Sequence, residues 1–88
     1  MIIIKDYRKD PKNARLGFVD IEMPKIKMFF TDLNVCEKNG NRWVDWGSCP
    51  PLEENGEWRK RAGFTEKGLK TSFSEAVLNE LSNFTDDL

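Results

Sequence analysis

The clearest structural signal in the chain is the segment Leu33-Asn34-Val35-Cys36-Glu37-Lys38-Asn39-Gly40-Asn41-Arg42-Trp43-Val44-Asp45-Trp46. An Asn-Gly pair between segments that alternate apolar and polar residues is the strongest short-range signal for a β-hairpin with a two-residue loop. A loop of Asn39 and Gly40 pairs Leu33 with Trp46, Val35 with Val44, Cys36 with Trp43 and Glu37 with Arg42. The first two pairs form a core face, and Trp43 then lies on the opposite, outer face because strand side chains alternate.

A second hairpin is expected before the first one. Residues 19–23 alternate apolar and acidic side chains, and residues 26–30 follow after Pro24-Lys25. With those two residues as the loop, the predicted pairs are Val19 with Phe30, Ile21 with Met28 and Glu22 with Lys27. Even-numbered side chains face the core in residues 26–30, whereas the odd-numbered Leu33 and Val35 face it in the next hairpin. The alternation must therefore be interrupted between them, and we expect a β-bulge near Thr31-Asp32.

Residues 48–56 contain two prolines and a further Asn-Gly pair, which indicates a long loop that ends in a turn. Residues 58–65 are predicted to form a strand with Trp58, Ala62 and Phe64 in the core. In this strand Arg59 and Arg61 point to the outer face. Residues 2–7 are expected to add one more strand.

The C-terminal part predicts a helix. Ser72-Phe73-Ser74-Glu75 fits a capping box at a helix start. An apolar stripe follows at helical spacing, made by Phe73, Val77, Leu81 and Phe84. The expected fold is therefore α+β: a curved antiparallel sheet of four to five strands, followed by one C-terminal helix that packs on the sheet or on a second subunit. Residues 1–84 form one domain, and residues 85–88 form an acidic tail.

Composition argues against an enzyme. The 88 residues suffice for one domain and include no histidine, and no serine or cysteine lies in a nucleophile motif. Cys36 and Cys49 are expected to be free thiols, so we predict no metal and no cofactor. An outer-face cluster of Asp20, Asp32 and Asp45 is the alternative metal site. No apolar run is long enough to cross a bilayer and no secretory signal begins the chain, so we expect a cytoplasmic protein.

Charge is distributed unevenly along the chain. The totals are 14 basic and 15 acidic residues, but residues 1–15 hold five bases and two acids, and residues 58–70 hold five bases and one acid. Residues 75–88 hold four acids and no base. A mixed surface without function is one interpretation of this asymmetry. The other is a basic surface that binds nucleic acid.

Aromatic and basic residues on the outer sheet face favour the second interpretation. Aromatic rings stack on unpaired bases, and lysine or arginine side chains neutralise phosphates between them. The residues predicted to bind nucleic acid are Lys25, Lys27, Phe29, Arg42, Trp43, Arg59, Lys60 and Arg61. The alternative is that the helix or a partner covers Phe29 and Trp43, and that the basic side chains are only solvated and bind no nucleic acid. The tail residues Asp86, Asp87 and Leu88 either dock on a replication or transcription protein, compete with nucleic acid, or form a frayed end.

A resemblance to known protein families points to the same class of ligand, nucleic acid. The motifs Asp32-Leu33-Asn34-Val35, Asn39-Gly40, Trp43-Val44, Glu54-Asn55-Gly56-Glu57-Trp58-Arg59 and Ala76-Val77-Leu78-Asn79-Glu80 resemble the SpoVG (septation regulator) family. Strands followed by a helix also look like the fold of positive cofactor four, Whirly proteins and some phage replication proteins. These families imply a homodimer that binds single-stranded DNA or RNA. The family's basic stretch near the terminal helix is only partly present, as Lys67 and Lys70, and the acidic ending belongs to neither pattern.

Two functional hypotheses follow. The first is a small homodimer that binds single-stranded nucleic acid without sequence preference in replication, recombination or transcription. The resemblance to phage replication proteins suggests a phage accessory protein, which would lie in the host cytoplasm if it is phage-encoded. The second is a protein-interaction module, or phage modulator of a host protein, that uses exposed aromatic residues and the acidic tail.

Overall fold

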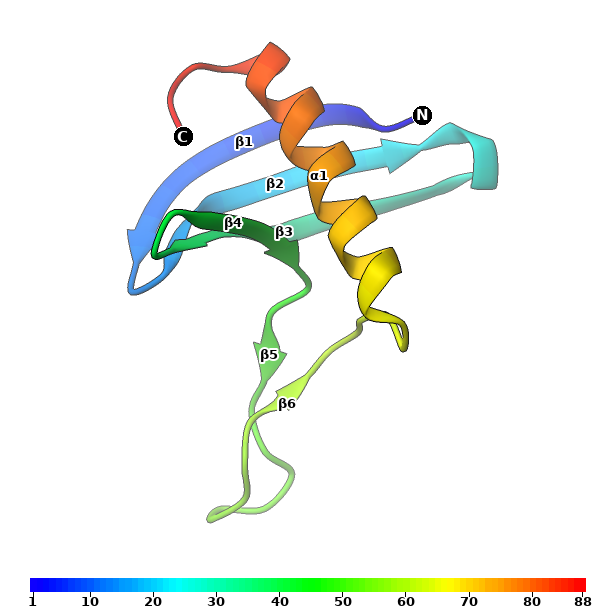
Figure 1. The fold of residues 1–88 in the computed structure, drawn as a ribbon. Coiled ribbons are helices and arrows are strands. Elements are labelled where there is room, and N and C mark those ends of the chain that lie inside the picture. The colour runs from blue at the N-terminus through cyan, green and yellow to red at the C-terminus, as the bar shows by residue number, and fades with distance from the viewer.

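The computed structural model describes residues 1–88 and contains a four-stranded antiparallel sheet, a two-stranded sheet and one C-terminal α-helix. The larger sheet has the order β1-β2-β3-β4 and the smaller one pairs β5 with β6 (Figure 1). The elements are β1 (Ile3–Lys12), β2 (Arg15–Met23), the 3-10 helix η1 (Pro24–Ile26), β3 (Met28–Lys38), β4 (Asn41–Asp45), β5 (Ser48–Cys49), β6 (Arg59–Lys60) and α1 (Lys67–Phe84). The predicted α+β class is confirmed, and the sheet is not closed into a barrel.

Helix α1 crosses one face of the four-stranded sheet (Figure 1). The core lies between these two layers and consists of Ile2, Val19, Ile21, Leu33, Val35, Val44, Phe73, Val77 and Leu81. We call the face of the sheet turned away from α1 the outer face. The alternation of strand side chains places Phe18, Asp20, Asn34 and Trp43 there.

The β3–β4 hairpin has the predicted register. Val35 pairs with Val44, Cys36 pairs with Trp43, and Glu37 pairs with Arg42. Asn39 and Gly40 both have positive φ angles, 54° and 81°, as a type I′ turn requires. The dipeptide therefore fixes both the turn type and the pairing.

The β2–β3 hairpin has a different register from the predicted one. Ile21 pairs with Phe30 and Met23 pairs with Met28, so the strands are displaced by two residues. The chain reverses through η1 and then Lys27, whose φ of 56° is left-handed, rather than through a two-residue loop. The bulge expected near Thr31-Asp32 is confirmed: the register shifts there, and Asp32 has a φ of 58°.

Residues 48–61 form a projection that we call the arm. It leaves the sheet after β4 and extends away from the body of the molecule (Figure 1). Ser48 pairs with Lys60 and Cys49 pairs with Arg59, so only two residues of the predicted 58–65 strand are in a ladder. Trp58 and Ala62 are exposed, and the prediction that they belong to the core is wrong. Phe64 is also exposed in part, although its ring contacts Trp46 and Phe73.

Helix α1 begins at Lys67, five residues before the predicted cap, so the capping-box prediction at Ser72 is wrong. Ser72 is an exposed residue inside the helix, and the actual N-cap, Glu66, forms no side-chain cap bond. The predicted stripe is buried at Phe73, Val77 and Leu81 but exposed at Phe84. This helix lacks the apolar composition needed to cross a membrane.

Candidate nucleic-acid interface

The centre of the outer face carries a charge cluster built on Arg8. Its Nη2 lies 2.9 Å from Asp20 Oδ1 and 2.6 Å from Asp32 Oδ1, and its Nη1 lies 2.7 Å from Asp6 Oδ2. Asp20 also accepts a hydrogen bond from the Asp32 backbone N–H, at 2.9 Å. Three carboxylates around one guanidinium give this part of the face a net negative charge, which disfavours phosphate.

The same cluster shifts the pKa values of its members. Hydrogen bonds from Arg8 hold the pKa of the Asp20 carboxyl below its ordinary value of 3.8. Hydrogen bonds to Asp20 and Asp6 raise the pKa of Arg8 further above neutrality. Asp20 and Asp32 belong to the alternative metal site that the sequence suggests. In the structure the Arg8 guanidinium contacts both carboxylates and occupies the place of a metal ion between them. Asp45 belongs to a different set of contacts, described below.

The structure separates the residues that we predicted to bind nucleic acid. Lys25, Lys27 and Phe29 lie at the turn that joins β2 and β3, whereas Trp43 lies opposite Cys36 near the other end of β3. At a rise of about 3.3 Å per residue, the seven steps from residue 29 to residue 36 separate Phe29 from Trp43 by roughly 23 Å. The two aromatic side chains therefore do not form one stacking surface.

Arg42 and Trp43 lie on opposite faces of β4. Arg42 Nε donates a hydrogen bond to Glu37 Oε1 at 2.7 Å, and the pair shares the strand face of Val44. The half-buried Trp43 is on the outer face, and its Nε1 donates to Asp45 Oδ2 at 3.0 Å. Each side chain thus has a structural partner, and the two do not face a common ligand.

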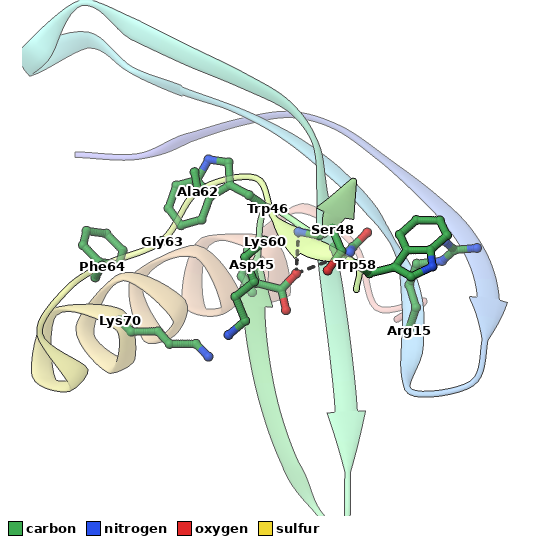
Figure 2. Close-up of a pocket in the computed structure, with 13 residues that line it drawn as sticks. Arg15, Asp45, Trp46, Ser48, Trp58, Lys60, Ala62, Gly63, Phe64 and Lys70 are labelled. Atoms are coloured by element: carbon green, nitrogen blue, oxygen red, sulfur yellow. Dashed lines mark hydrogen bonds between the residues drawn. The ribbon is translucent and has the colours of Figure 1, made fainter. Parts of the chain in front are cut away.

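Arg59, Lys60 and Arg61 lie together on the exposed arm. Arg61 Nε donates to the Ser48 backbone oxygen at 3.3 Å, which ties the two strands of the arm. Lys60 lines a cleft of about 420 Å³ between the arm, β4 and the start of α1 (Figure 2). Of the residues predicted to bind nucleic acid, Lys60 is the one that lines this cleft.

Three cations from distant parts of the chain line this cleft: Arg15, Lys60 and Lys70. The ring of Trp58, which is 67% exposed, also lines it. Neither lysine forms an ion pair, so both ammonium groups are available to a ligand. Arg15 stacks on the Phe18 ring at 4.3 Å and lies 3.4 Å from an Asp10 carboxylate oxygen.

Asp45 is the acidic residue of the cleft. Its Oδ1 accepts hydrogen bonds from the Gly47 backbone N–H at 2.8 Å and from Asn34 Nδ2 at 3.3 Å. Its Oδ2 accepts the Trp43 bond already described. Both carboxylate oxygens of Asp45 are thus occupied by donors from the protein. The cleft is lined by three cations and one anion, so the net charge of its lining is positive.

The C-terminal tail lies against the body. Asp87 Oδ1 is 2.8 Å from Lys9 Nζ, and this hydrogen bond raises the pKa of Lys9. Leu88 is half-buried and packs against the core, whereas Asp86 is exposed. In this arrangement Asp87 and Leu88 have partners within the chain.

Both cysteines are free thiols. Burial, with a smaller contribution from the charge of Asp45, raises the pKa of Cys36 to about 11. Its thiol is therefore protonated and weakly nucleophilic at neutral pH. No group of three or more histidine, cysteine or carboxylate side chains is arranged to hold a metal ion.

Sequence reasoning missed three residues of the cleft. Trp58 was assigned to the core, and Arg15 and Lys70 were counted only within the two basic stretches. The charge runs were the available signal, because Arg15 ends the first and Lys70 ends the second. Nothing in the spacing of residues 15, 60 and 70 indicates that they meet.

Comparisons with known proteins do not identify the chain. No family model, curated protein or solved structure matches it. The resemblance to the SpoVG and positive cofactor four families therefore stays a prediction, and the functional proposal depends on the geometry of the cleft.

Proposed function

We propose that this protein binds single-stranded nucleic acid, without sequence preference, in the cleft between the arm and α1. The observation that carries the proposal is the conjunction of Arg15, Lys60 and Lys70 with the exposed ring of Trp58. Cations beside an open aromatic ring suit a polymer of phosphates and flat bases.

Each component has a separate physical role. Lys60 and Lys70 would neutralise phosphates and release condensed counterions, which makes binding favourable at low salt. Trp58 would stack on a base, and such stacking contributes about 1–3 kcal/mol. Arg59 lies beside Trp58 on the exposed arm, where it extends the basic surface beyond the cleft.

Single strands are favoured over duplexes because stacking on Trp58 needs an unpaired base. The cleft offers lysine and arginine contacts, which recognise phosphate in any sequence. The cleft borders the outer face at Asn34, and its lining does not include Arg8 or the carboxylates around Arg8. The predicted class of ligand is thus kept, and its proposed site lies between the arm and β4 rather than at Phe29 and Trp43.

A salt titration tests this function. Fluorescence anisotropy of labelled oligo-dT should give a plot of log affinity against log salt with a slope of about −1.4, since Lys60 and Lys70 each contribute about −0.7 on a single strand. Affinity should then fall roughly sevenfold between about 50 and 200 mM salt. A duplex of equal length should bind more weakly at both salt concentrations.

Two results would reject the proposal. One is an affinity for oligo-dT that does not change with salt, because phosphate contacts could not then contribute to binding. The other is a preference for the duplex, because a paired base cannot stack on Trp58.

A further inference from the structure

The β2–β3 turn presents apolar and basic side chains to solvent at one end of the sheet (Figure 1). Its exposed apolar residues are Ile26, Met28 and Phe29, with accessible fractions of 55%, 46% and 73%. Lys25 and Lys27 lie on either side of Ile26 in the sequence and are exposed as well. We call these five residues the tip. A group of exposed apolar side chains of this kind marks a site of contact with a protein or a membrane.

The tip is positively charged. Residues 23–31 contain two lysines and no acid. Neither lysine forms an ion pair within the chain, so both ammonium groups are available to an external anion. The acid opposite the tip is Glu22, which pairs with Phe29 across the ladder and whose Oε1 lies 3.7 Å from Lys5 Nζ. The charge of the tip therefore favours a partner with negative charge.

The shape and composition of the tip favour a lipid surface over nucleic acid. The chain reverses through η1 and the left-handed Lys27, so the side chains project from a convex turn. Phe29 is the one apolar residue of the tip whose ring stacks on bases, and no tip residue lines the cleft. Exposed aliphatic and aromatic side chains beside lysines are the composition that enters the boundary between lipid headgroups and acyl chains.

The dimensions of the turn match the depth of such an insertion. Apolar faces of peripheral proteins enter this boundary by about 5–10 Å, or roughly two to three residues of an extended strand. Counted from Lys27, that depth reaches Met28 and Phe29. Lysine side chains bury their methylene stems at such a boundary and keep their ammonium groups in water. Ile3, which is exposed, pairs with Glu22 at this end of the sheet and adds an apolar side chain.

We propose that the tip binds the surface of a membrane that contains anionic lipids. Contact with a bilayer surface needs no segment long enough to cross the bilayer. Two lysines and a few apolar side chains give weak and reversible attachment, because stable anchoring requires more buried apolar area or charge. The cleft is lined by other residues, so lipid binding by the tip does not depend on the proposed nucleic-acid binding.

Cosedimentation of the full chain with vesicles tests the proposal. The wild type should bind vesicles of phosphatidylcholine with about 30% phosphatidylserine at about 50 mM salt. Binding should weaken at about 500 mM salt, because salt screens the attraction between the lysines and the lipid headgroups. Vesicles of phosphatidylcholine alone should bind the protein more weakly than the anionic vesicles at the lower salt concentration.

Two variants of the tip and two matched controls locate the contact. Lys25→Glu should lower the partition coefficient at least about fivefold, since one lysine near an anionic surface contributes about that factor. Phe29→Ala should lower it roughly tenfold, because a phenyl ring is lost from the lipid boundary. Lys38→Glu at the β3–β4 turn and Leu52→Ala on the arm also change exposed residues, and each should alter it by less than about twofold.

Absence of binding to anionic vesicles at the lower salt concentration overturns the proposal. So does binding that neither tip variant weakens, or that a control variant weakens as much, because the contact must then lie elsewhere. Tip variants that keep vesicle binding but lose oligo-dT binding would assign the tip to nucleic acid and would also contradict the proposal. Circular dichroism checks that each variant is folded, and if one tip variant fails to fold, the other decides.

Discussion

Ser74 connects the helix to the edge of the sheet through one hydroxyl. Its Oγ accepts the Val44 backbone N–H at 3.0 Å and donates to the Val44 backbone oxygen at 3.3 Å. Val44 lies on β4, which has no neighbouring strand on its other side. The serine therefore bonds to edge-strand backbone groups that a further strand would otherwise satisfy.

Replacement of this hydroxyl should be costly. Ser74→Ala leaves buried backbone groups without this partner, so we expect the free energy of unfolding to fall by about 1–3 kcal/mol. Ser72→Ala is the matched control on the same helix and should change the value by no more than about 0.5 kcal/mol, because Ser72 is exposed. Urea denaturation measures both. Equal losses in the two variants would mean that Ser72 has a stabilising role that the structure does not give it.

Asp20 gives stability a defined pH dependence. Arg8 lowers its pKa in the folded state below 3.8, so the ion pair stabilises the protein above about that pH. As pH falls through the folded pKa, the carboxylate gains a proton and this contribution is lost. Since Arg8 is exposed in part, we expect a loss of about 1 kcal/mol rather than the value of a buried pair.

Comparison of the wild type with Asp20→Asn isolates this effect. The variant should be less stable by about 1 kcal/mol at pH 6, and this difference should shrink progressively as the pH falls below 3.8, with urea midpoints as the readout. A constant difference across this range would show that the ionisation of Asp20 is not responsible for the stabilisation.

At the scale of elements, the β3–β4 hairpin was predictable because Asn39 and Gly40 both accept positive φ angles. Pro24-Lys25 carries no such preference, and the chain forms η1 there instead. The predicted register was wrong by two residues, an even number. Side chains kept their faces, so Ile21 was correctly assigned to the core despite the wrong partner.

The start of α1 and the arm were mispredicted for related reasons. Leu69 lies four residues before Phe73 and continues the helical spacing of the apolar stripe, but it is 51% exposed and does not belong to the core. The predicted start followed the Ser72-Phe73-Ser74-Glu75 pattern instead of this spacing. Alternation from Trp58 to Phe64 identifies a strand face but not whether that face meets the core. The arm leaves the sheet, so Trp58 has nothing to cover it.

At the scale of the whole molecule, the candidate site depends on tertiary arrangement. Arg15 begins β2, Lys60 belongs to the arm, and Lys70 lies in the first turns of α1. Their meeting requires the arm to leave β4 at Gly47, whose φ of 73° is left-handed, and the chain to return along it to the helix. Local sequence patterns contain no information on this path, whereas the basic character of residues 58–70 was evident.

Two exposed aromatic residues on different parts of the molecule allow a matched test of the cleft as the nucleic-acid site. Trp58 lines the cleft and is 67% exposed; Phe29 lies at the β2–β3 turn and is 73% exposed. Neither is in the core, so alanine at either position should leave the fold intact, with circular dichroism as the check. Only Trp58 is placed beside the cations of the cleft.

The measurement is the affinity of the two variants for labelled oligo-dT at low salt. Loss of one stacked base, about 1–3 kcal/mol, predicts that Trp58→Ala binds roughly 5- to 150-fold more weakly than the wild type. Phe29→Ala should bind within about twofold of the wild type, since a surface change away from the site has little effect. Unchanged binding by Trp58→Ala, or a larger loss in Phe29→Ala, would contradict the assignment of the cleft as the nucleic-acid site.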